Sequence, residues 1–400
     1  MQPQPPPFDP HALDAFVALV GARVWSARMA EITDRAKAGP RSGKAVRQRH
    51  VLELAIDRLR GSLIRPASTA ELHAARLASD AVALAGQFGS QARTRWCEKL
   101  FDAMAGDGSL VPVFHMLRTA RLQRARGFGV RFAGLEDNAP YDLLLTRGEA
   151  VAEVACDVVS AEDGRLLRRG AWSRLADRVD AELRAWLGAY PGRYLLKMTL
   201  PHGLQEHPDG AALDAVHGRI HRLLKTRGRR DQDASAVLRL EPLLVNGNRS
   251  DDANLLPSLR REFGPEAHLS VTTADGGLFV MAARAGRADE VAVAVRRRLF
   301  DIAPTRLSGT RPGILAMFID DADPGEWRGL RDSLELEGEA RQFLAYRSAR
   351  PVIAVTCASR CELFGMAAPD AVEDGELRFR NPAHPDARAA ELASAVLSSV

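Results

Sequence analysis

Residues 127–170, GFGVRFAGLEDNAPYDLLLTRGEAVAEVACDVVSAEDGRLLRRG, decide the fold predicted for this chain. Three short apolar runs, at 128–133, 141–146 and 150–159, are separated by clusters of Gly, Asp and Asn, which is typical of consecutive strands. Side chains alternate along a strand, so Glu153 and Asp157 fall on one face of the third run. Acidic side chains inside apolar strands are costly to bury without a partner, so this face is a candidate site.

A third acid, Asp142, stands near the start of the preceding strand, where a hairpin brings it close to Glu153. Three carboxylates that converge on a sheet edge are the ligands that a hard cation such as Mg²⁺ needs. We therefore expect Asp142, Glu153 and Asp157 to be metal ligands. The alternative is that these acids pair with the many arginines nearby and carry out no chemistry.

Length and composition are those of an ordinary globular protein. The chain has 400 residues, enough for two or three domains, with 46% hydrophobic and 26% charged residues. No apolar run approaches a membrane span, and the polar, Pro-rich start has no signal-peptide core, so we expect a cytoplasmic protein without a membrane partner. The four cysteines are scattered, which argues against a disulfide framework.

The charge balance weakly favours an anionic partner. Net charge is +4, and lysine supplies only five of the 55 basic residues. Arginine is therefore the available side chain for forked contacts to phosphate.

The chain divides by pattern into four predicted parts. Residues 1–9 form a disordered lead-in, and 10–106 carry apolar residues at three- and four-residue spacing, which predicts a helical domain. Helices and strands alternate over 109–365, which predicts an α/β domain with a central mixed sheet flanked by helices. Residues 366–400 are predicted to form a peripheral tail.

Four short segments carry a resemblance to a known superfamily. They are Arg126–Val130 (RGFGV), Tyr141–Leu143 (YDL), Val154–Asp157 (VACD) and Gly164–Leu167 (GRLL). In this order the segments resemble the restriction-endonuclease-like PD-(D/E)XK superfamily, over about residues 110–360. The helix at 289–300 and the strands at 313–319 and 351–357 resemble the later elements of that fold.

The resemblance implies a Mg²⁺-dependent phosphodiesterase site, which this sequence keeps only in part. In that site the first Asp and an acid on the next strand hold the metal, and a lysine two positions on orients the attacking water. Asp142 matches the first position. The second acid is replaced by Ala155 and the lysine by Asp157, while the preceding helix offers His115 and Met116 where a glutamate often stands.

Three functional interpretations follow. The favoured one is a catalytically degenerate nuclease-like protein that binds a DNA or RNA backbone, or binds a protein through its N-terminal helical domain. The residues expected to contact nucleic acid are Arg165, Arg168, Arg169 and Arg174. The second is an active nuclease with a rearranged site, whose catalytic residues are Asp142, Glu153, Asp157 and Lys197. The third is a non-enzymatic scaffold or interaction protein.

Overall fold

The computed structural model describes residues 10–61, 66–205, 210–243, 258–260, 262–264 and 267–399. The lead-in predicted at 1–9 lies outside these residues. The chain forms two compact units, each with its own sheet, so the predicted α/β class is confirmed. Unit 1 contains Met1–Thr33, Arg49–Asp163 and Ala292–Val400, and unit 2 contains Asp34–Gln48 and Gly164–Val291.

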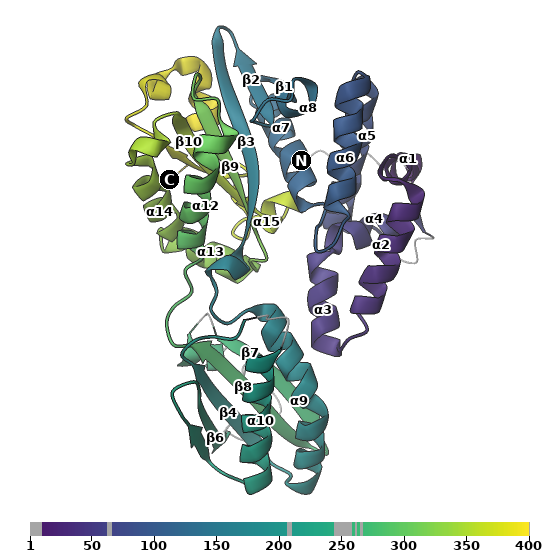
Figure 1. The fold of residues 1–400 in the computed structure, drawn as a ribbon, viewed down its shortest axis with the longest axis vertical. Helices are drawn as coiled ribbons and strands as arrows, with labels where there is room; N and C mark the ends of the chain where they lie inside the picture. The colour runs from purple at the N-terminus through teal and green to yellow at the C-terminus, as the bar shows by residue number, and fades with distance from the viewer. Residues whose placement is uncertain are drawn as a thin grey trace. The chain divides into compact units, whose positions relative to one another are not determined.

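Unit 1 is built on a six-stranded mixed sheet with the order β1-β2-β3-β9-β10-β11 (Figure 1). The first three strands form an antiparallel meander, β9 and β10 run parallel to β3, and β11 runs antiparallel to β10. The strands span Gly129–Arg131 (β1), Leu143–Arg147 (β2), Ala150–Ser160 (β3), Gly313–Asp320 (β9), Val352–Ser359 (β10) and Leu377–Arg380 (β11).

One face of this sheet shares its core with the N-terminal helices. Apolar side chains of these helices, such as Phe16 and Trp96, belong to one buried cluster with Val154 and Phe318 of the sheet. The predicted helical domain at 10–106 is therefore not a separate body: most of it packs on the sheet of unit 1. The helices are α1 (Pro10–Val20), α2 (Ala22–Arg35), α4 (Val51–Arg60), α5 (Thr69–Gln87), α6 (Ser90–Ala103) and α7 (Val111–Ala125).

Helices from the later part of the chain cover the other face (Figure 1). Along β9, Ile314, Ala316 and Phe318 join the cluster with the N-terminal helices, and the alternate residues between them are also buried. A strand that is apolar on both faces is expected in a parallel sheet with helices on each side. The covering helices are α12 (Val291–Arg306), α13 (Pro324–Asp332) and α14 (Glu335–Leu344).

Unit 2 has a five-stranded mixed sheet with the order β5-β6-β4-β8-β7. Helices α9 (Arg169–Ala189) and α10 (Ala211–Thr226) bury one face of it. Helix α3 (Pro40–Arg49) is tied to α9, because Arg41 donates to Asp180 over 3.0 Å and Asp177 accepts from the Ser42 N–H. The strands are β4 (Arg193–Leu200), β5 (Arg230–Gln232), β6 (Val237–Pro242), β7 (His268–Ala274) and β8 (Gly277–Ala285).

The predicted boundaries at 109–365 and 366–400 differ from these units. The 109–365 segment contributes to both sheets rather than to one. The C-terminal segment, predicted to be peripheral, supplies β11 and buries Phe379, Leu392 and Val396. Among the described residues, no helix is both long and apolar enough to cross a membrane.

Truncating Phe379 to alanine tests whether this last segment belongs to the core. Phe379 is 3% exposed, so Phe379→Ala should lower the free energy of unfolding of unit 1 by about 3–5 kcal/mol. Leu397→Ala is the control, because Leu397 is 47% exposed and its loss should cost less than about 0.5 kcal/mol. Urea denaturation measures both. Equal, small effects would mean that the segment is peripheral after all.

Candidate functional site

The carboxylate of Asp142 lies just before β2 and is held by three donors. Its Oδ2 accepts from the Cys156 backbone N–H over 2.8 Å and from the Arg306 guanidinium over 2.6 Å. Its Oδ1 accepts from Lys99 Nζ over 3.2 Å. Asp142 is 6% exposed, and a carboxylate that is taken out of water is stabilised by charge-assisted hydrogen bonds of this kind.

The position opposite Asp142 is occupied by a residue that cannot bind a metal. Leu143 pairs with Val154, and the Asp142 N–H donates to the Val154 carbonyl, so the antiparallel register places Asp142 across from Ala155. This is where the resemblance expects the second acid. The methyl group of Ala155 is fully buried there.

Glu153 and Asp157 flank Ala155 on the same face of β3, and each has its own partner. Glu153 is fully buried and accepts from the Ser308 backbone N–H over 2.8 Å and from the Ser308 hydroxyl over 2.5 Å. Asp157 binds Arg298 through both oxygens, over 2.7 and 3.1 Å. This forked pair raises the pKa of the Arg298 guanidinium.

The three acids therefore lie on one face of the sheet, but each carboxylate binds its own partners and they do not converge on one metal position. Two partners, Arg298 and Arg306, lie on α12, and Ser308 is the second residue after that helix. In the part of the chain that the structure describes, no three His, Cys, Asp or Glu side chains gather in an arrangement that could hold a metal. Mg²⁺ requires a near-octahedral shell of oxygen atoms, and carboxylates already bound to separate cations and N–H groups do not fit it.

Lys197 belongs to the other unit. It lies on β4, where its ammonium group is 2.9 Å from Glu241 and 3.1 Å from Glu262. The hydrogen bond to Glu241 is the main reason that its pKa is raised. The structure thus brings Asp142, Glu153 and Asp157 onto one sheet and places Lys197 on a second sheet among acids of its own.

The four predicted nucleic-acid-binding arginines also belong to unit 2, around the start of α9. Arg165 is buried, Arg168 is the residue before the first turn, Arg169 is the first helical residue, and Arg174 is exposed. Burial, followed by the charges of Arg169 and Arg165, lowers the pKa of nearby His268 to about 3. The positive charges of Arg169 and Arg165 therefore both act at His268.

His115, where the family often has a metal-binding glutamate, is a core residue. Its ring is 2% exposed, and Nε2 is 2.9 Å from the Ala316 carbonyl of β9. Because Nε2 must donate to that carbonyl, the neutral ring carries its proton there. Burial lowers the pKa of His115 to about 4.

Sequence reasoning missed the residues that hold the carboxylates: Lys99, Arg298, Arg306 and Ser308. The signal available was weak. Lys99 is one of only five lysines, and Arg296–Arg298 form a basic run on an apolar-periodic helix. Nothing local connects such residues to acids more than 40 positions away.

The lowered pKa of His115 predicts a measurable pH dependence of stability. The unfolded chain binds the proton near pH 6.5 and the folded chain near pH 4, so stability is complete above pH 6.5 and falls as the pH drops. This group alone should remove about 2 kcal/mol between pH 7 and pH 5. His115→Gln can still donate to Ala316 but does not titrate, so urea denaturation should show a smaller loss. An equal loss in both proteins would contradict the assignment.

The arrangement of these side chains is the only structural information that bears on function. Comparisons with protein-family models, with curated proteins and with solved structures gave no significant match. The resemblance to the PD-(D/E)XK superfamily accordingly stays a prediction. It rests on the four sequence segments and on the positions of Asp142, Ala155 and Asp157 in the sheet.

Proposed function

We propose that unit 1 is a restriction-endonuclease-like core without metal-dependent hydrolysis, and that the protein acts by binding a nucleic-acid backbone. The observation that carries the first part is the carboxylate of Asp142. In the family it would be the primary metal ligand, and here Lys99, Arg306 and the Cys156 N–H hold it instead. Two fixed positive charges take the electrostatic role of a divalent cation at that carboxylate.

The order of elements in unit 1 supports the proposed core. The helix and three strands of the motif region become α7, β1, β2 and β3, and the later helix and strands become α12, β9 and β10. These strands occupy consecutive places in a single sheet. Three of the four segments that match the motif, at 126–130, 141–143 and 154–157, thus lie on neighbouring elements of unit 1, whereas Gly164–Leu167 belongs to unit 2.

The chemistry of the replaced positions argues against hydrolysis. A hydrolytic site needs a metal or a general base beside a water molecule near the scissile phosphate. Ala155 can neither bind a metal nor accept a proton. Asp157 stands where a lysine would offset the charge of the transition state, and it is itself neutralised by Arg298.

The distribution of cations favours a polyanionic partner. Four cations, Lys99, Arg298, Arg306 and Arg311, lie within 4 Å of the three carboxylates, and Asp301 and Asp163 add further negative charge near Arg298. Unit 2 adds the arginines around His268. Basic side chains that contact phosphates supply most of the sequence-independent affinity for nucleic acids.

Salt dependence of DNA binding tests the proposal. We expect the logarithm of the binding constant for duplex DNA to fall linearly with the logarithm of the salt concentration. Replacing Arg168 and Arg174 together with glutamine should reduce that slope by about 1–2, because each lost phosphate contact removes about 0.9. Fluorescence anisotropy measures it. Arg23→Gln, an exposed arginine of unit 1, is the matched control and should leave the slope nearly unchanged. Absence of salt-dependent binding would favour the scaffold interpretation.

A cleavage assay separates the degenerate core from the active nuclease. With Mg²⁺ or Mn²⁺ present, we expect no cleavage of DNA or RNA above background, and the same result for Asp142→Asn. Because the metal ligands are replaced or occupied, removal of Asp142 should change nothing in this assay. Metal-dependent cleavage by the natural protein that disappears in Asp142→Asn would show that the site is active.

A further inference from the structure

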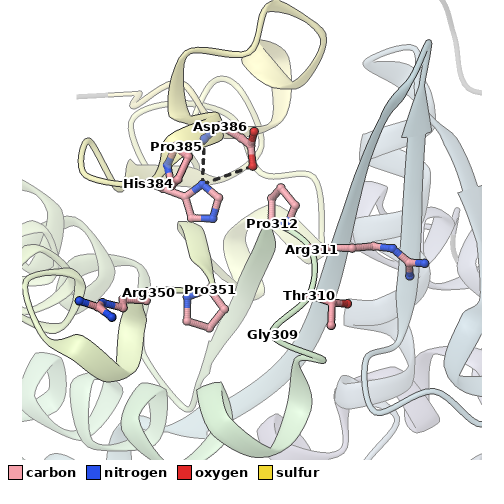
Figure 2. Close-up of a pocket in the computed structure, with 9 residues that line it drawn as sticks. All are labelled: Gly309, Thr310, Arg311, Pro312, Arg350, Pro351, His384, Pro385 and Asp386. Carbon is pink, nitrogen blue, oxygen red and sulfur yellow. Dashed lines mark hydrogen bonds and ion pairs between the residues drawn. The ribbon is translucent and has the colours of Figure 1, made fainter.

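A cavity of about 360 Å³ opens at the amino ends of β9 and β10 in unit 1 (Figure 2). Its walls come from three loops, at residues 309–312, 350–351 and 384–386. Arg311 of this lining is one of the four cations counted above, and the proposed function uses none of the other lining residues. The volume is in the range of cavities that take small organic ligands and is larger than a single ion needs.

One buried polar group is turned into this cavity. His384 is 9% exposed, and its Nδ1 accepts from the Asp386 backbone N–H over 3.1 Å. Because Nδ1 accepts, the neutral imidazole carries its proton on Nε2. Figure 2 shows Nε2 pointing away from Asp386, towards the space between Pro312 and Pro351. Among the described residues, Nε2 has no hydrogen-bond partner, so it offers a free donor to a ligand.

The walls combine apolar surface with positive charge at the rim. Pro312 and Pro351 present rings to the cavity and Pro385 lies beside His384, while Arg311 and Arg350 flank the cavity on opposite sides and extend outwards (Figure 2). The Arg311 guanidinium also donates to the Tyr141 hydroxyl over 3.2 Å. Among the described lining residues the one acid is Asp386, which is half-exposed, and Arg311 also lies 3.8 Å from Glu153, so Arg350 is the cation that the rim adds for an anion.

We propose that this cavity binds the terminal phosphate of a nucleotide. The Nε2–H of His384 donates to a phosphate oxygen, Arg350, which is exposed at the rim, supplies the countercharge, and the proline rings contact the sugar or base. A free nucleoside monophosphate and the phosphorylated end of a strand share this chemistry. The assignment of a nucleotide rather than another organic phosphate rests on the proposed function.

Two substitutions of His384 separate its two nitrogens. In His384→Asn the amide oxygen can replace Nδ1 as acceptor for the Asp386 N–H, so the loop is retained and the donor into the cavity is lost. In His384→Gln the amide nitrogen can replace the Nε2 donor, and the contact to Asp386 is lost. Comparison of the two variants therefore distinguishes a ligand contact from a structural role.

Isothermal titration calorimetry with adenosine 5′-monophosphate, on the full chain, is the test. We expect saturable binding that is weaker by about tenfold or more for adenosine and for His384→Asn, and largely kept in His384→Gln. Arg350→Gln should weaken binding and reduce its dependence on salt. No saturable binding, equal affinity for adenosine, or full affinity in His384→Asn would overturn the proposal.

Oligonucleotides with a 5′-phosphate or a 5′-hydroxyl identify the source of the phosphate. Preference for the 5′-phosphate that His384→Asn abolishes indicates a strand end. Monophosphate binding without that preference indicates a free nucleotide. Binding of 5′-hydroxyl duplex DNA involves internal phosphates alone, so it tests the proposed function independently of this cavity.

Discussion

The arrangement of unit 1 depends on the contact between α12 and the acidic face of β2 and β3. Buried carboxylates destabilise a fold unless donors satisfy them. Without this helix and the loop that follows it, Glu153 and Asp157 would lose the side chains that bind them, and Asp142 would keep only Lys99 and the Cys156 N–H. Arg306 donates to Asp142, Ser308 donates to Glu153, and Arg298 donates to Asp157. A buried pair of this kind is a modest source of net stability, but loss of one partner is costly, so the helix and the strands are fixed in one register.

The same contact lies at the end of a long insertion, because Gly164–Val291 of unit 2 separates β3 from the rest of α12 in the sequence. Parallel neighbouring strands need a crossover connection, and the crossover from β3 to β9 runs through most of unit 2 before α12 returns to the sheet. At the end of this crossover, the pair between Arg298 of α12 and Asp157 of β3 holds the returning helix against the sheet. Unit 2 has its own sheet and its own buried cluster, so its core does not depend on that of unit 1.

The elements that could be predicted were those with a strong local pattern. The alternation at 150–159 and the apolar runs at 313–319 and 351–357 correspond to β3, β9 and β10 with little error. Pairing between distant residues could not be predicted, because Asp142 and Arg306 are 164 positions apart and no periodicity links them. Strand β11 was missed because its four residues, LRFR, alternate with charge and resemble a solvated tail. The division into two sheets was missed because each strand of unit 2 also fits a single α/β domain.

Saturable binding of Mn²⁺, measured by electron paramagnetic resonance on the natural protein and on Asp142→Asn, tests the central claim most directly. If Lys99 and Arg306 take the place of the metal at Asp142, both proteins should show only weak, non-saturable association that is alike in the two. Saturable binding in the natural protein that is lost in Asp142→Asn would contradict the account, because it would mean that the cations give way and the carboxylates form a metal site.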